Sequence, residues 1–367
     1  MKKLKKTADL TVAVIGGGNV GTQFACVCAS RGCEVRVYTS RSSEFSDTLE
    51  LVDEFGAITY GSIGMASSDM KAVIDGADVI FVTNPAFMLE DIASVMLPYI
   101  TEEQIIVVLP GTGGAEYAFH DCLDKGAVLC GVQRVPAVAR LEQYGKRVRC
   151  EGLRKEMFLA SIPRSYAADV SGFIAELFGI PCTPLPCYLC VTLTPSNPIL
   201  HTTRLRTLFE DYSEGMIYDS CPLFYGEWSD RSSELLLKCD QELQDMISLM
   251  DKADLRSVKS LKIHYESEDV SALTDKLRSI ESLHNIPTPM IKVDGGYIPD
   301  LGSRYFKADF PYGLAIIESF AEVLSYDAVN IRQTMEWYRK VTGDNRWFSV
   351  EEHGILSIGD IYDFYHC

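Results

Sequence analysis

The sequence predicts an α/β protein in two parts, with a doubly wound parallel sheet in residues 1–186 and an all-α domain in residues 187–367. Three observations favour this fold class. Short β-branched apolar runs alternate with helical segments through the first half of the chain. Amphipathic helical patterns fill the second half. A proline-rich stretch, residues 181–194, separates the two patterns and marks the expected domain boundary.

A glycine motif joins the first strand to the first helix. The expected strand at residues 10–15 leads directly into Gly16-Gly-Gly-Asn-Val-Gly21, and a helix (22–31) and a strand (34–38) follow. In such a βαβ unit the glycines allow a tight turn, close approach of a pyrophosphate, and close packing of helix on strand. The helix N-terminus then faces the phosphates. The motif therefore predicts a Rossmann-type dinucleotide site, whose contacts we expect at Gly16, Gly18, Asn19, Val20 and Gly21.

The end of the second strand favours NADP over NAD as the coenzyme. An NAD enzyme usually carries an acidic residue there, which binds the ribose 2′-hydroxyl. Here the strand is followed by Thr39, Ser40 and Arg41, and no acid occurs before Glu44. Two hydroxyls and a guanidinium suit a 2′-phosphate better. The alternative is that Arg41 is an ordinary solvated loop charge.

Two later strand ends are candidates for the nicotinamide region. Strands are expected at residues 77–83 and 104–109, followed by Asn84-Pro85 and by a second glycine-rich turn, Pro110-Gly-Thr-Gly-Gly114. Ligands of open α/β sheets bind at the carboxyl ends of the strands. We therefore expect coenzyme contacts at Thr83, Pro85 and Gly113, and a substrate contact at Thr112. The alternative for each residue is plain turn chemistry.

The remaining elements follow from the same patterns. Further strands are expected at residues 128–132, 147–150 and 156–162, and helices at 87–99, 169–178, 234–250, 269–279, 310–324 and 330–341.

One stretch of the second half carries the main catalytic candidate. Residues 194–201, Thr-Pro-Ser-Asn-Pro-Ile-Leu-His, predict a rigid turn before a helix, with His201 and Asn197 placed toward a ligand. His201 could equally be a structural histidine. Farther along, Arg304 and Asp309 are candidates to bind a substrate carboxylate and to orient the imidazole, which a carboxylate makes a better base. Asp309 could instead cap the helix that starts at Phe310-Pro311, and Arg304 could form a surface ion pair.

Composition restricts the possible partners and compartment. The net charge of −17 argues against binding to nucleic acid or an anionic membrane. Twelve cysteines in a chain of 367 residues indicate a reducing compartment rather than a disulfide framework. The pair Cys187 and Cys190 has C-x-x-C spacing without a second pair, so we expect no metal site. The basic N-terminus precedes an apolar run too short for a signal peptide, and the sequence predicts a cytoplasmic protein.

The chain resembles the octopine/nopaline (opine) dehydrogenase family nearly end to end. The motifs are Val14-Ile-Gly-Gly-Gly-Asn-Val-Gly21, Val107-Val-Leu-Pro-Gly-Thr-Gly-Gly-Ala-Glu116, Val135-Pro-Ala-Val-Ala-Arg140, Thr194-Pro-Ser-Asn-Pro-Ile-Leu-His201 and Ser303-Arg-Tyr-Phe-Lys-Ala-Asp-Phe-Pro-Tyr-Gly-Leu314. The resemblance implies NAD(P)H-dependent reductive condensation of an amino acid with a 2-keto acid. It also implies that His201 is catalytic, that Asp309 pairs with it, and that Arg304 contacts substrate. Thr202-Thr203, where a proline is common, and Gln133 depart from the family pattern and leave the substrates open.

Two other functions stay open. A ketopantoate-type or hydroxyacid reductase shares the architecture but usually relies on a catalytic lysine, and a catalytically silent NADP-binding sensor would need none of the acid/base residues. Tyr225 and Trp228 either contact the amine's side chain or only pack. The expected partners are two small molecules, an amino acid and a 2-keto acid, and a homodimer is left open.

Overall fold

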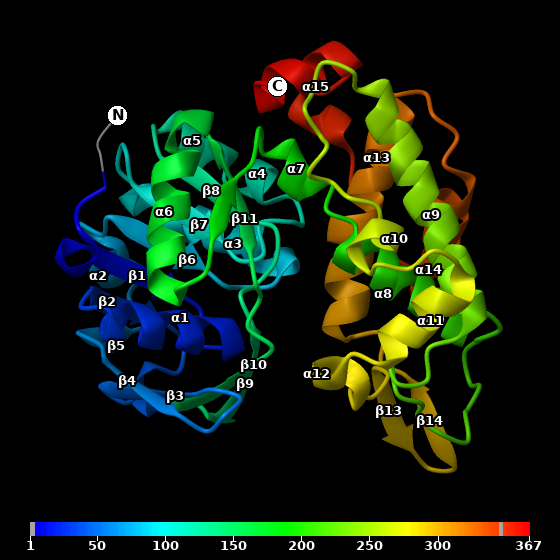
Figure 1. Ribbon diagram of the computed structural model, residues 1–367, viewed down its shortest axis with the longest axis horizontal. Coiled ribbons are helices and arrows are strands. Elements are labelled where there is room, and N and C mark those ends of the chain that lie inside the picture. Colours follow the sequence, from blue (N-terminus) through cyan, green and yellow to red (C-terminus); the bar gives the residue numbers. More distant parts are fainter. Residues whose placement is uncertain (1–3, 345–347) are drawn as a thin grey trace. The chain divides into compact units, whose positions relative to one another are not determined.

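The computed structural model describes residues 4–344 and 348–367. The chain divides into two compact units, Met1–Thr192 and Leu193–Cys367, and each unit is described by itself (Figure 1). The division falls between Thr192 and Leu193. It lies a few residues after the boundary expected between residues 186 and 187, and still within the proline-rich stretch 181–194.

The first unit is built on the expected doubly wound sheet. Its eight strands lie in the order β12-β11-β8-β7-β6-β1-β2-β5, and all neighbours are parallel except β8 and β11. The chain leaves β1 outward through β2 and then returns to β6 on the other side of β1, which makes the β1–β6 boundary a topological switch point. The strands are β1 (Thr11–Ile15), β2 (Glu34–Tyr38), β5 (Met65–Ser67), β6 (Val79–Val82), β7 (Ile105–Val108), β8 (Val128–Val132), β11 (Met157–Ile162) and β12 (Cys182–Pro184).

Apolar side chains hold the helices of this unit against the sheet. The Phe24 ring of α1 lies 4.9 Å from Phe81 of β6 and 4.9 Å from Phe178 of α6, and the first two are fully buried. Removing such rings from water is the dominant favourable term in folding. The helices are α1 (Asn19–Ser30), α2 (Met70–Ile74), α3 (Leu89–Met96), α4 (Ala115–Ala118), α5 (His120–Asp124), α6 (Ala167–Phe178) and α7 (Leu189–Thr192).

A second, four-stranded sheet was not expected. It has the order β4-β3-β10-β9 and combines two excursions that are far apart in sequence: β3 (Thr48–Val52) with β4 (Ile58–Ser62), and β9 (Val138–Gln143) with β10 (Arg147–Glu151). The excursions meet because β3 and β10 pair in parallel. The backbone N–H of Leu141 in β9 donates to Asn19 Oδ1 at 2.9 Å, which ties this sheet to the start of α1.

The second unit is helical, as expected, and includes a two-stranded hairpin. Helix α9 packs against α8, α11 and α14. Among the helices of the described ranges, none has the length and apolarity that crossing a bilayer requires. The elements are α8 (Ser196–Leu208), α9 (Asp230–Leu249), α10 (Leu261–His264), α11 (Val270–Arg278), α12 (Glu281–His284), β13 (Met290–Val293), β14 (Gly296–Pro299), a π-helix (Tyr305–Leu314), α13 (Ala315–Val323), α14 (Val329–Thr342) and α15 (Ile358–Tyr365).

A buried carboxyl group fastens α10 to α9. Asp240 of α9 is 2% exposed, and its Oδ2 accepts the backbone N–H of Leu261, the first residue of α10, at 2.7 Å. Burial raises the pKa of Asp240 to about 7, although the hydrogen bond from Leu261 opposes the shift. An aspartate in the unfolded chain titrates near about pH 4. The folded state therefore binds a proton more tightly than the unfolded state across that interval.

We expect the stability of this unit to depend on Asp240. Its contribution is fully present below about pH 4 and is lost as the pH rises toward the folded pKa of about 7. The Asp240→Asn variant has no such loss. Its free energy of unfolding relative to the parent should therefore rise from pH 4 to pH 8 by on the order of 4 kcal/mol. Denaturant unfolding at several pH values measures this difference, with Glu234→Gln on the exposed side of α9 as the control. A difference that does not change with pH would contradict the prediction.

Candidate active site

His201 lies on the buried side of α8. The Pro-Ser-Asn-Pro stretch is not a separate turn before the helix, because α8 begins at Ser196 with Pro195 at its N-cap position. Pro198 is tolerated in this first turn, where the backbone N–H groups have no partner within the helix. His201 therefore lies one turn inside the helix and is 5% exposed. Asn197, half-buried, precedes it by four residues and so lies on the same side of α8.

The His201 ring is held at both nitrogens. Nδ1 lies 2.8 Å from Oδ2 of Asp309, and Nε2 lies 2.8 Å from the Tyr225 hydroxyl. The His201 and Asp309 side chains are 7% and 12% exposed. An ionised carboxylate can only accept a hydrogen bond, so the Nδ1–H donates to Asp309 and Nε2 is left as the acceptor. The structure thus brings His201 and Asp309 into direct contact.

Asp309 reaches His201 from inside a π-helix. The expected helix over residues 310–324, with Asp309 as a possible cap, is wrong at its start, because the π-helix begins at Tyr305 and runs directly into α13. Pro311 lies inside it. Gly313 packs on Pro198 of α8, where an added Cβ would lie 3.1 Å from the proline ring. The wide helix and this glycine allow Asp309 to approach α8 closely.

Aromatic rings surround the imidazole. The centroids of Tyr305 and Phe224 lie 4.8 and 5.7 Å from that of His201. Trp228 stacks on Tyr225 at 6.2 Å. Burial raises the pKa of Tyr225 well above its usual value, so its hydroxyl stays protonated near neutral pH and can donate to Nε2. No pattern in the sequence indicates this contact.

Arg204, one turn after His201 on α8, fixes the segment that carries Tyr225. Its guanidinium donates to the carbonyls of Phe224 (3.1 Å) and Glu227 (2.6 Å) and to the Ser232 hydroxyl (3.1 Å). Arg204 is 2% exposed, and burial lowers its pKa to about 10. A buried guanidinium that donates to three oxygens is satisfied without a carboxylate. One helix therefore carries His201 and also positions the hydroxyl that faces it.

Arg304 lies at the start of the π-helix, next to this cluster. Its side chain is exposed, and its guanidinium lies 5.7 Å from the ring of Tyr305, which itself contacts His201. Within residues 4–344 and 348–367, Arg304 forms no ion pair.

In the first unit the glycine turn has the geometry that a dinucleotide needs. Gly16 has φ of +111°, a conformation that favours glycine. A Cβ on Gly21 would lie 1.8 Å from the Gly16 carbonyl oxygen, whereas a Cβ on Gly18 would meet nothing within 4 Å. The helix starts at Asn19 rather than at Thr22, so Gly18 is its N-cap. Without a side chain at Gly18, the first N–H groups of α1 stay open to an anion.

The other expected coenzyme contacts lie just after β6 and β7. In the sheet, β6 lies beside β1, and β7 lies on the other side of β6. The Thr83 hydroxyl donates to the Ile15 carbonyl at 3.0 Å and so fastens the glycine turn. Asn84 Oδ1, buried beside Gly16, has no hydrogen-bond partner within the described residues. Pro85 comes next in the chain, and half-buried Thr112 and Gly113 (φ +89°) follow β7. The three strand ends thus meet at one edge, and the buried amide oxygen is available to a ligand.

Two of the expected contacts are already engaged elsewhere. The Asn19 side chain accepts from Leu141, and Val20 packs on the apolar core, so only their backbone groups face the turn. Arg41 is exposed, as a loop charge would be, but it also contacts two neighbours. Its Nε donates to Glu44 at 2.6 Å, and its guanidinium carbon lies 3.8 Å from the ring centroid of Tyr144. Thr39 Oγ1 lies 2.6 Å from the Tyr144 hydroxyl, while Ser40 is exposed.

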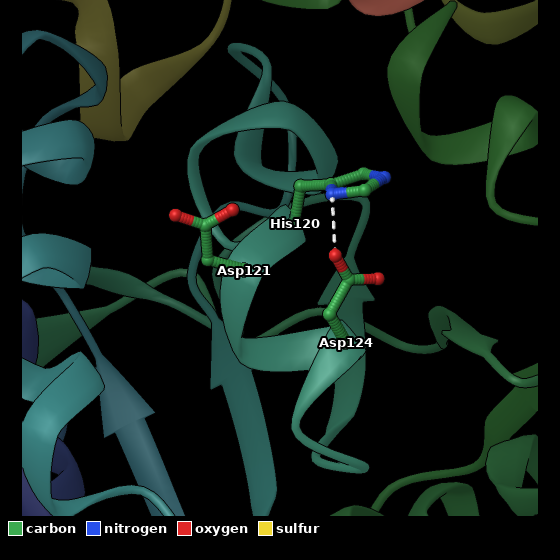
Figure 2. A group of neighbouring side chains, drawn as sticks. All are labelled: His120, Asp121 and Asp124. Atoms are coloured by element: carbon green, nitrogen blue, oxygen red, sulfur yellow. Dashed lines mark ion pairs between the residues drawn. The ribbon is translucent and has the colours of Figure 1, made fainter.

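Two further groups of side chains lie outside this arrangement. His120, Asp121 and Asp124 project from α5 (Figure 2), all three exposed, with one possible ligand atom from each within 4.8 Å of the others. The His120 and Asp124 atoms are 3.5 Å apart, and α5 has only five residues. Cys187 and Cys190 are both buried, and Cys190 lies on α7 rather than on the expected strand or loop.

Comparison with known proteins matches the two halves of the chain to different family models. Residues 184–342 match the alpha-helical domain of NAD/NADP octopine/nopaline dehydrogenases, and residues 11–116 match the N-terminus of NAD-dependent glycerol-3-phosphate dehydrogenase. Octopine dehydrogenase of Mizuhopecten yessoensis is 27% identical over 363 residues, which cover 91% of this chain and 90% of that protein.

Solved structures share the fold. An octopine dehydrogenase determined with NADH and L-arginine superposes with a TM-score of 0.83 at 23% identity, covering 96% of this chain and 98% of that one. A ketopantoate reductase from Ralstonia eutropha JMP134 fits less well, with a TM-score of 0.60 at 15% identity, covering 91% and 99%. The helical-domain match and the near full-length similarity to octopine dehydrogenase agree with the residue patterns. The chain is thus similar to the octopine dehydrogenases over nearly its whole length, and its residues 184–342 match their alpha-helical domain.

Proposed function

We propose that the chain catalyses the NAD(P)H-dependent reductive condensation of an amino acid with a 2-keto acid. The observation that carries this proposal is the His201 imidazole, hydrogen-bonded at 2.8 Å to Asp309 and at 2.8 Å to Tyr225. This arrangement supplies a general acid/base with a fixed tautomer in a chain whose first unit has a dinucleotide-type glycine turn.

The reaction needs several proton transfers, which one imidazole can serve in turn. The amine attacks the keto carbon only when it is unprotonated, and the resulting carbinolamine gives an imine when its hydroxyl leaves as water. His201 Nε2 accepts the ammonium proton and returns a proton to the departing hydroxyl. The reduced nicotinamide supplies the hydride that converts the imine to a secondary amine. Asp309 stabilises the imidazolium that forms between these steps.

The substrates carry carboxylates, which a chain of net charge −17 must bind against its own field. Arg304 is the proposed anchor, because its guanidinium is exposed beside Tyr305 and can pair with a carboxylate through two parallel hydrogen bonds. Asn197, on the same side of α8 as His201, and Thr112 in the first unit are the other proposed substrate contacts.

For the coenzyme we propose NADP ahead of NAD. Thr39, Ser40 and Arg41 follow β2, where the adenosine ribose binds in such folds. The pyrophosphate would lie over Gly18 at the open N-terminus of α1, where an added Cβ meets nothing within 4 Å. Thr83, Pro85 and Gly113 would contact the nicotinamide half.

A matrix of amino acids against pyruvate, 2-oxoglutarate, oxaloacetate and glyoxylate tests the reaction. We expect oxidation of NADPH or NADH only when an amino acid and a keto acid are both present. Oxidation with a keto acid alone would instead identify a ketopantoate-type or hydroxyacid reductase, the alternative that the shared fold leaves open. Coenzyme binding without oxidation by any pair would favour a silent sensor.

The His201→Ala variant should lose turnover, because no other group in its place can carry the protons. A decrease in kcat of about 10² to 10⁴ is expected for the loss of a general acid/base. NADPH binding, measured by quenching of protein fluorescence, should survive, since His201 belongs to the second unit. Unchanged turnover would remove His201 from the mechanism.

The Asp309→Asn variant should lower kcat more than it raises KM. An amide can donate to the ring as well as accept from it, so the Nδ1–H form is no longer enforced. The control is Asp300→Asn, which also replaces an aspartate by asparagine near the start of the π-helix but does not contact His201. Its kcat should stay within about twofold of the parent value. Equal effects of the two substitutions on kcat would contradict the role of Asp309.

The Arg41→Ala variant should weaken NADPH more than NADH. The guanidinium can pair with a 2′-phosphate but has no equivalent partner on the unphosphorylated ribose. Fluorescence titration with both coenzymes gives the two dissociation constants. An equal loss of affinity for both would overturn the preference for NADP.

A further inference from the structure

Arg41 is engaged on two sides by residues of its own unit. Glu44, three residues later, accepts a hydrogen bond from Nε at 2.6 Å and takes a second contact from the terminal guanidinium nitrogen. The carboxylate therefore occupies the fork of donors that an arginine presents to planar anions. The pair raises the pKa of Arg41 and lowers that of Glu44, so both groups stay charged near neutral pH.

Tyr144 holds the other side of Arg41. This residue lies in the turn between β9 and β10 of the second sheet, and its ring is 3.8 Å from the guanidinium carbon. Its hydroxyl lies 2.6 Å from Thr39 Oγ1 at the end of β2. A Cβ on Gly17 would lie 2.8 Å from that hydroxyl and 2.7 Å from the Phe45 ring. Tyr144 therefore packs on the glycine turn and holds the stacked Arg41 beside it.

The position of this pair matters for coenzyme choice. The group that distinguishes NADPH from NADH is a 2′-phosphate on the adenosine ribose, and the end of β2 is where that ribose binds. The phosphate and the Glu44 carboxylate are both anions that fit the same guanidinium donors. They cannot use the same N–H groups at once, so one must leave before the other binds.

We propose that Glu44 is a specificity-determining residue, an internal competitor of the 2′-phosphate for Arg41. This inference rests on the proposed dinucleotide-dependent function. Glu44 limits the preference for NADPH by requiring the Arg41 contact to be broken before the phosphate binds. NADH, which has no phosphate there, binds with the Arg41–Glu44 pair intact. Arg41 and Glu44 together, rather than the presence or absence of an acid at the end of β2, set the coenzyme preference.

Direct titration of the full chain with NADPH and NADH tests this proposal without relying on turnover. Glu44→Gln should raise the ratio of NADPH to NADH affinity by about threefold or more, the scale of a surface ion pair. The change should lie in NADPH binding, with the NADH affinity within about twofold of the parent. Asp47→Asn is the matched control, since it removes an equal charge from an exposed position three residues away. It should leave the ratio unchanged.

A second variant separates direct competition from a general change in charge. In the Arg41→Ala background, Glu44→Gln should have no further effect on the ratio, because the two substitutions act on one contact. An unchanged ratio in Glu44→Gln, an equal effect of Asp47→Asn, or an effect that persists without Arg41 would each overturn the proposal. If the parent chain binds neither coenzyme, the proposed function fails together with this inference. If it binds both and turns over amine with keto acid, only the role of Glu44 is under test.

Discussion

The hydrogen bond between His201 Nδ1 and Asp309, 2.8 Å long and almost shielded from water, is the constraint on which the candidate site depends. It fixes the proton on one nitrogen and directs the other at the Tyr225 hydroxyl. Much of the second unit follows from this contact. The π-helix carries Asp309 to α8, Gly313 allows the approach, and Arg204 holds the segment that carries Tyr225. A single helix, α8, thus organises both the base and its surroundings.

In the first unit the main constraint is the close approach of two backbone segments in the glycine turn. Gly21 must lack a side chain because the Gly16 carbonyl lies where its Cβ would be, and Thr83 fastens the same turn from the neighbouring strand end. The second sheet contributes Tyr144, which packs on the turn and on Arg41. The residues proposed to set coenzyme selectivity are therefore distant in sequence but in contact with one another.

Much of the fold and of the candidate site could be predicted from sequence, for identifiable reasons. The parallel sheet followed from apolar strands and a glycine turn, and the placement of His201 and Asp309 followed from family motifs. The other contacts between distant segments were not predictable. Nothing in local periodicity indicates that β3 pairs with β10, or that Tyr144 and Tyr225 reach Arg41 and His201. The start of the π-helix was missed because Pro311 is typical of a helix start, whereas here it lies inside a helix that begins at Tyr305.

The tautomer of His201 shows most directly whether Nε2 can act as the base. It can be read from the nitrogen-15 NMR signals of the imidazole at neutral pH. The signals are assigned by their loss in the His201→Asn variant. We expect a protonated Nδ1 and an unprotonated Nε2 in the parent chain, with mixed tautomers in Asp309→Asn. A proton on Nε2 and none on Nδ1 in the parent would mean that the ring donates to Tyr225 instead. That result would contradict the assignment of Nε2 as the base.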